Sequence, residues 1–223
     1  MAWLRPLLKV GTNRSVHHVD ELLPSGYDSY IRLFHPFVPW TCGIAEPVDQ
    51  DLRRSWESLA SEAGVLFHGE LAWKSLASVL PIEPDGGRKY AVHEGQLERS
   101  TAHKMMEVLT ANMSTQQIHF VFSHSGHLAE PMSFLGESGD FDAVIDASSV
   151  PGPTYIWPED HGWFVSTDYD LTSTYIACDA RTSARLLAER ELETVEVSLD
   201  SRIDNGSDQL NGTGYAEEYR SST

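Results

Sequence analysis

The stretch Tyr155–Asp179 (YIWPEDHGWFVSTDYDLTSTYIACD) constrains the fold more than any other part of the chain. It is dense in aromatic and β-branched residues, which favour strands, and it also carries several acids. Two extended segments, Trp163–Tyr169 and Thr172–Cys178, flank Asp170-Leu171. This arrangement predicts an antiparallel hairpin, although the turn lacks the Asn-Gly or Asp-Gly pair of a tight hairpin and its type stays open.

Alternation along the first of these segments predicts which side chains point into the core. One face would carry the larger and more apolar set and the other face the smaller set, namely Trp163, Val165, Thr167 and Tyr169 against Phe164, Ser166 and Asp168. We therefore expect Trp163 to be buried against helices and the Asp168 carboxylate to be solvated.

Helical periodicity dominates the first half of the chain. Apolar residues at helical spacing predict helices over Asp49–Ala63, Glu70–Leu80 and Thr101–Asn112, and Gly64 is placed to end the first of them. A helical face is formed by Tyr27, Tyr30, Ile31 and Phe34, but Tyr30–Phe37 is also aromatic and β-branched enough for a strand, so both interpretations stay open.

Strand patterns dominate the second half. Further strands are predicted over Ile118–Ser123, Phe141–Asp146 and Thr194–Leu199, the last at a sheet edge, and a helix over Ala180–Arg190 with Asp179 as its N-cap. Helices early and strands late predict an α+β fold, with N-terminal helices followed by a mostly antiparallel sheet. We expect a single α+β domain over residues 1–202 and a flexible acidic tail over 203–223.

Net charge narrows the class of partner. The 223 residues carry a formal net charge of −17, which argues against nucleic acids and anionic membrane surfaces as partners, because both select basic proteins. A basic protein partner would suit this charge. The chain has no long apolar run and no signal-peptide pattern, and its two cysteines, Cys42 and Cys178, fit buried thiols in a reducing compartment. We therefore expect a cytoplasmic protein that spans no membrane.

No assembled catalytic motif is present in the sequence. It has no P-loop, no dinucleotide-binding glycine pattern and no zinc-type CxxC pair. Ser123 lacks the glycine two residues earlier that a nucleophile elbow requires, and His119, His124 and His127 follow a strand-then-turn pattern that does not align metal ligands. The sequence therefore favours a binding protein over an enzyme and predicts no cofactor.

One pair of acids allows an alternative. Asp168 and Asp170 form a DxD pattern, and two carboxylates on one face of a strand can hold a hard cation. A metal-dependent enzyme that uses this pair and a nearby histidine is the alternative hypothesis, and a subunit of a larger assembly is another. Because DxD is common by chance, we favour acids that solubilise the edge of an aromatic strand pair.

The candidate binding residues combine large aromatic side chains with acids. Tryptophan and tyrosine often anchor protein interfaces, and a rim of acids would suit lysine and arginine on a partner. The candidates are Trp157, Asp160, Trp163, Asp168, Asp170 and Tyr175.

Two segments carry a resemblance to known proteins. PSGYDSYIRLFHP near the start and WPEDHGWFVSTDYDLTSTYI late in the chain resemble an uncharacterised family of actinobacterial proteins with a late WPxDxxWxVxTxxDxxSTY motif. That family implies no activity for this chain. Pro24, Tyr27, Trp163, Phe164 and Asp168 also resemble positions of the SUKH superfamily of bacterial immunity proteins, which implies a non-enzymatic, protein-binding module.

Overall fold

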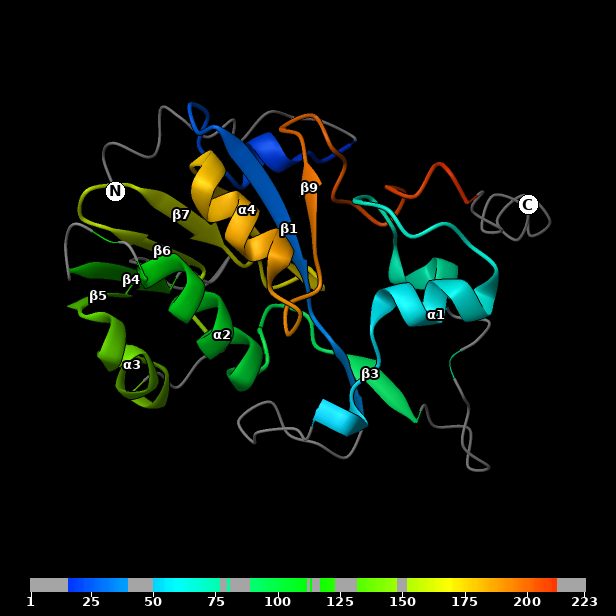
Figure 1. Cartoon of the computed structure of the whole chain (residues 1–223), viewed down its shortest axis with the longest axis horizontal. Coiled ribbons are helices and arrows are strands. Elements are labelled where there is room, and N and C mark those ends of the chain that lie inside the picture. Colours follow the sequence, from blue (N-terminus) through cyan, green and yellow to red (C-terminus); the bar gives the residue numbers. More distant parts are fainter. Residues whose placement is uncertain are drawn as a thin grey trace.

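A seven-stranded antiparallel sheet organises the fold (Figure 1). The structure is a computed structural model that describes residues 16–39, 50–76, 80, 89–111, 113, 117–122, 132–147 and 152–211. The strand order is β5-β4-β6-β7-β8-β1-β9. Its strands are β1 (Ser29–Phe34), β4 (Ile118–Phe122), β5 (Met132–Gly136), β6 (Tyr155–Pro158), β7 (Trp163–Ser166), β8 (Ser173–Cys178) and β9 (Thr194–Val197).

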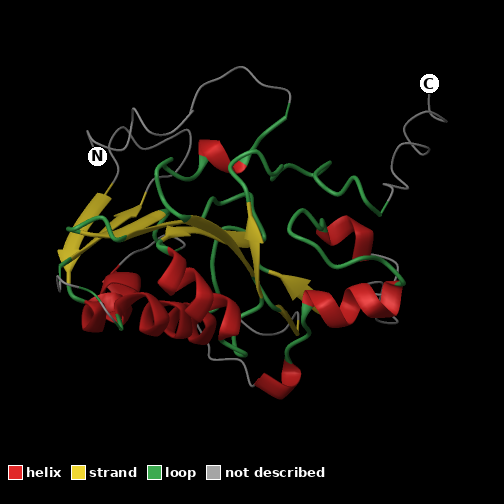
Figure 2. Ribbon diagram, turned by 45° about the horizontal axis from the view of Figure 1, so that its top comes forward, coloured by secondary structure: helices red, strands yellow, loops and turns green. Residues whose placement is uncertain are grey.

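Three helices cover one face of this sheet. They are α2 (Arg99–Thr110), α3 (Phe141–Ala147) and α4 (Ala180–Ala188), and Figure 2 shows them together on one side of the strands. Their apolar residues pack on Ile31, Phe120, Trp163 and Val165 in one core cluster. The predicted inward orientation of Trp163 is confirmed, since 3% of its surface is exposed. No helix among the described residues is long and apolar enough to cross a membrane.

Loops and a 3-10 turn cover the opposite face (Figure 2). The turn is η1 (Val19–Glu21), and with Leu22 and Leu23 it packs against Phe164 and Tyr175. Phe164 therefore is fully buried as well, because the central strands are enclosed on both faces. Strands that are covered on both faces have hydrophobic residues on both faces, so the alternation of residues in the sequence could not show which of them reach the surface.

A smaller unit adjoins the end of β1. It contains β2 (Phe37–Pro39) paired with β3 (Tyr90–Val92), together with α1 (Trp56–Ala63) and the 3-10 helices η2 (Gln50–Leu52) and η3 (Trp73–Leu76). Trp56 is fully buried at its centre, 4.9 Å from the Phe34 ring and 5.0 Å from the Phe37 ring between centroids.

The α+β class and the antiparallel sheet are confirmed, but the predicted N-terminal position of the helices is not. Within the described ranges, the first α-helix begins at Trp56, which follows β1 in the chain. Of the two interpretations left open for Tyr27–Phe37, the strand is correct, since Ser29–Phe34 pairs with both β8 and β9. Tyr30 and Phe34 fit a helical spacing in sequence, but pairing on both sides satisfies the backbone of an extended chain.

The prediction of a strand over Phe141–Asp146 is wrong, because this segment is helix α3. It follows the 3-10 helix η4 (Ser138–Asp140), where the amide of Glu137 donates to the Asp140 carboxylate at 2.9 Å. Phe141 and Val144, three residues apart, are both buried. A short apolar run fits either period, and here the capped start decides for the helix.

Helices α1 and α4 are present with shifted bounds, whereas a helix over Glu70–Leu80 is not confirmed. Helix α1 is shorter than Asp49–Ala63 because Ser55 caps it, and Gly64 ends it at φ 67°. Of Glu70–Leu80, the described part contains only the 3-10 helix η3, and residues 77–79 lie outside the described residues. Helix α4 begins at the predicted cap Asp179, but only Leu186 faces inward while Leu187 is exposed.

The hairpin and the edge strand are both found as predicted. Strands β7 and β8 pair antiparallel, with Ser166 opposite Tyr175 and Trp163 opposite Cys178. Strand β9 forms one edge of the sheet. Strand β6, which continues the ladder from Tyr155, was not predicted as a separate element, because its four residues end at a proline.

The start of the expected tail is ordered. Ser207 and Asp208 are buried, at 3% and 0% exposure, so a flexible tail does not begin at residue 203. Residues 203–211 pack because their polar groups find partners on another segment, which composition does not reveal. The remaining tail residues, 212–223, lie outside the described residues.

Candidate binding site

A groove of about 450 Å³ opens beside the loop between β7 and β8. Four acids and two tyrosines lie in its lining, with a histidine, an asparagine and aliphatic residues between them. We call this the acidic groove, lined by His17, Glu21, Leu22, Tyr155, Asp168, Tyr169, Asp170, Leu171, Ile203, Asp204 and Asn205.

A tight turn presents two of the acids. Asp168 and Asp170 lie in the β7–β8 loop, and the amide of Asp170 donates to the Asp168 carboxylate at 3.1 Å. Gly95 fixes the position of this loop, because its amide donates to the carbonyl of Leu171 at 2.9 Å. A Cβ at residue 95 would lie 2.5 Å from the Cα of Tyr169, so only glycine allows this approach.

The four acids of the groove differ in their partners. Glu21 is hydrogen-bonded to His17 at 3.0 Å, and Asp204 forms an ion pair with Arg202 at 2.7 Å. Asp168 and Asp170 form no ion pair with any described residue. Burial raises the pKa of Asp168 above its ordinary value and outweighs the hydrogen bond from the Asp170 amide, which lowers it, so a nearby cation would stabilise the charged form.

A second, smaller cavity of about 40 Å³ adjoins the groove. The two share five lining residues, which makes them contiguous: Asp170, Leu171, Ile203, Asp204 and Asn205. Three further lining residues, Arg32, Ser173 and Tyr175, come from the central strands β1 and β8, and we call this space the arginine cavity.

Strand register places these three side chains together. Arg32 lies opposite Tyr175 in the β1–β8 pair, and Ser173 is two residues from Tyr175 on the same face. The Arg32 Nε donates to the Ser173 Oγ at 2.8 Å, and its Nη1 donates to the carbonyls of Gly69 and Leu71 at 2.8 and 3.0 Å. The guanidinium also stacks on Phe34, 4.1 Å from the ring centre.

Arg32 is thus a buried cation without an ion-pair partner among the described residues. Glu70 and Glu193 act on its charge from beyond ion-pair distance. Its Nη2 group and the Tyr175 hydroxyl make no hydrogen bond within the described part of the chain, and neither is fully enclosed. Burial raises the pKa of Tyr175, so the hydroxyl keeps its proton and can donate it.

The structure separates the six predicted site residues. Trp157, Trp163 and Tyr175 are buried, with 3%, 3% and 2% of their surfaces exposed. They cannot anchor a partner at the surface, and this part of the prediction is corrected, because both faces of the sheet are covered. Tyr175 reaches a site only through the arginine cavity.

The three predicted acids remain near the surface. Asp168 and Asp170 lie together in the acidic groove. The prediction of a solvated Asp168 is corrected, because this residue is half-buried. Asp160 lies in an exposed turn, where its carboxylate accepts from the amide of Gly162 at 3.0 Å. It lines neither cavity.

Asp168 and Asp170 do not form the core of a metal centre among the described residues. They lie in a turn and not on one strand face, and they belong to no described group of three ligand residues whose atoms lie within 4.8 Å of each other. The described group that meets this distance is His18, Asp20 and Glu21, at the start of the chain segment that contains η1. His124, His127 and Cys42 lie outside the described residues, and burial raises the pKa of the Cys178 thiol to about 12.

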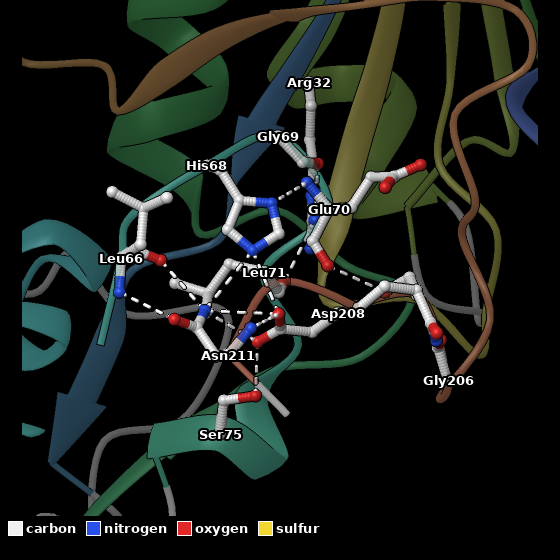
Figure 3. A network of polar contacts seen from close by, with 12 residues as sticks. Arg32, Leu66, His68, Gly69, Glu70, Leu71, Ser75, Gly206, Asp208 and Asn211 are labelled. Atoms are coloured by element: carbon white, nitrogen blue, oxygen red, sulfur yellow. Dashed lines mark hydrogen bonds and ion pairs between the residues drawn. The ribbon is translucent and has the colours of Figure 1, made fainter. Parts of the chain in front are cut away.

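A polar network near the groove combines serine, histidine and aspartate (Figure 3). The buried Asp208 carboxylate accepts from Ser75 Oγ at 2.5 Å and bonds His68 Nε2 at 3.0 Å. The amide of Glu70 donates to His68 Nδ1 at 3.2 Å. The carboxylate lies between serine and histidine, so the histidine cannot activate the serine, and the network instead ties residues 206–211 to residues 66–75.

Sequence reasoning missed Arg32 and the segment 203–207. The signal for Arg32 was present, since it is the one charged residue in the strand SYIRLF, and a charge within a buried strand needs a partner or a function.

In comparisons with protein-family models, curated proteins and solved structures, the chain matches none.

Proposed function

We propose that this protein is a non-enzymatic binding module whose acidic groove receives a lysine or arginine side chain of a partner protein. The observation that carries the proposal is the pair Asp168 and Asp170, two adjacent carboxylates with no cationic partner among the described residues, at the wall of a 450 Å³ groove. A ligand cation would stabilise the charged form of Asp168, whose pKa is raised mainly by burial.

The tyrosines of the groove support a basic side chain over a bare metal ion. Tyr169 is 52% exposed and Tyr155 is partly buried, so both offer ring surface to an alkyl stem or a guanidinium. Cations over aromatic faces gain about 0.5–2 kcal/mol. The net charge of −17 would also speed the encounter with a basic protein.

Capture with a matched pair of variants tests the proposal. The bait is the purified protein, and the variant Asp168→Asn/Asp170→Asn removes the two unpaired charges while keeping side-chain volume. We expect the wild-type bait to retain a protein at low salt and release it at moderate salt, and the variant to retain about tenfold less.

The control changes the same charge elsewhere. Glu57 and Glu196 are exposed and line neither cavity, so Glu57→Gln/Glu196→Gln should retain the partner as the wild type does. Equal retention by all three baits, or no salt-sensitive protein on the wild type, would refute the proposal. Retention lost in both double variants would indicate a general charge effect and no role for the groove.

A further inference from the structure

The arginine cavity supplies two hydrogen-bond donors that the protein leaves unused. The Tyr175 hydroxyl and the Arg32 Nη2 group lack a partner among the described residues, and their side chains are 2% and 5% exposed. Neither donor is fully enclosed by protein, so both are available to a group that enters the cavity. Tyr175 and Arg32 face each other across the β1–β8 ladder, so one ligand group can meet both.

From this pairing we infer that the arginine cavity binds a carboxylate. A guanidinium and a phenol hydroxyl both donate, and an anion accepts from both. Glu94, Asp170 and Asp204 in the same lining would repel a dianion such as phosphate more strongly than a monoanion.

The two cavities then define one ligand. They share five lining residues, so a carboxylate in the arginine cavity lies next to a cation in the acidic groove. A carboxy-terminal lysine or arginine of a protein carries both groups on one residue. This step rests on the proposed function for the cation, while the carboxylate site rests on Arg32 and Tyr175 alone.

Two small ligands separate the carboxylate from the cation. Nα-acetyl-arginine carries a free carboxylate, and Nα-acetyl-arginine amide replaces it with a neutral amide. Long-range attraction to a protein of net charge −17 favours the amide, which is the more positive of the two. We expect calorimetric titration to show about tenfold tighter binding of the acid form, because only a local anion site can reverse that order.

Tyr175→Phe tests the cavity with the least disturbance, since it removes one hydroxyl and keeps the ring in the core. We expect it to bring the acid form to within about twofold of the amide, with amide binding unchanged. Tyr30→Phe is the control, because Tyr30 lines neither cavity, and it should keep the preference. Arg32→Lys, in preparations that stay folded by circular dichroism, should also abolish it.

Each outcome is decisive. Amide binding that requires Asp168 and Asp170, without any preference for the acid form, would overturn the carboxylate site and leave the proposed function standing. A preference that survives Tyr175→Phe would overturn the assignment to this cavity. Failure of the amide to bind would overturn the proposed function. The carboxylate site would still be supported if sodium acetate bound to the wild type and Tyr175→Phe removed that binding. Free L-arginine binding more tightly than Nα-acetyl-arginine would overturn a protein terminus as the source of the ligand.

Discussion

Arg32 shows how a strand accommodates a charge inside a sheet. Three of its hydrogen bonds go to neutral oxygens, and its planar face lies on Phe34. Such contacts satisfy donors and offer a π-face without supplying a negative charge. Burial lowers the pKa of Arg32 because it removes the charged group from water. The guanidinium still stays protonated because the ordinary pKa of arginine is so high.

His35 makes stability depend on pH at the residue scale. It is 1% exposed, with Nδ1 2.7 Å from the carbonyl of His93 and Nε2 3.0 Å from the Thr174 hydroxyl, which in turn bonds Thr167 at 2.8 Å. A neutral imidazole satisfies both contacts, with the tautomer set by the carbonyl acceptor. Burial lowers the pKa of His35 to about 4.

The direction of the pH dependence of stability follows from the difference between the pKa values of His35 in the folded and unfolded states. The unfolded chain binds a proton near the ordinary value of about 6.5, whereas the folded protein binds it only near 4, so stability falls as pH falls through this window. We expect the free energy of unfolding of the wild type to lose about 3 kcal/mol between pH 7 and pH 4 relative to His35→Gln. Urea titrations of both proteins at several pH values measure the difference, and parallel curves would contradict it.

At the scale of elements, residues 206–211 act as a brace across the segment 66–75. Figure 3 shows Asp208 and Asn211 reaching this segment, where Asn211 bonds Leu66 through both its amide oxygen and its amide nitrogen. Burial raises the pKa of Asp208, but its hydrogen bonds to Ser75, Asn211 and His68 outweigh this and hold it below the ordinary value. The carboxylate therefore stays charged and bonded.

Removing that carboxylate should loosen the brace. Asp208→Ala leaves Ser75 and His68 without an acceptor, so we expect a loss of about 2–3 kcal/mol in the free energy of unfolding. Leu210→Ala serves as the control, because Leu210 is 67% exposed in the same segment and should change stability by less than about 0.5 kcal/mol. Chemical denaturation measures both, and equal effects would show that the segment is not held by Asp208.

Local sequence signals predicted the helices that have strong caps and the strands that are dense in β-branched residues. Asp179 bonds the amide of Thr182 at 2.7 Å as its position in sequence suggested, and the β7–β8 hairpin followed from its aromatic and β-branched composition. Helix α3 was misread because Phe141, Val144 and Ile145 suit either period. The order of residues 203–211 could not be read at all, since it depends on contacts with residues more than a hundred positions away.

At the scale of the whole molecule, the sheet joins an early strand to two late strands. Strand β1 lies between β8 and β9, although about 140 residues separate β1 from β8 in sequence. A chain that begins at Pro36 would lose η1 and β1 and would leave β8 and β9 unpaired with each other. We expect this fragment to show no cooperative thermal transition by near-ultraviolet circular dichroism, whereas the full chain shows one.

Adding a peptide of residues 16–35 provides a sharper form of the same test. If β1 completes the sheet, the peptide should restore part of the near-ultraviolet signal of the fragment. A cooperative transition in the fragment alone would show that β4 to β9 form a stable sheet without β1.

The candidate site was predictable only in part for a related reason. Asp168 and Asp170 lie two residues apart and were found from sequence. Arg32 and Tyr175 become neighbours only through strand register, and Asn205 joins them through the returning C-terminal segment. Non-local pairing of this kind leaves no spacing signal in one sequence, so the arginine cavity emerges only in three dimensions.

The division of the cavity lining between strands and loops bears on how the protein can evolve. Arg32, Ser173 and Tyr175 are interior residues of the sheet, so a substitution at any of them would change the fold's stability together with the proposed ligand binding. Glu94, Asp170 and Asn205 lie outside the strands, where substitutions are cheaper. Divergent descendants of this protein would therefore shift ligand preference through these loop positions first, while inheriting the same buried arginine.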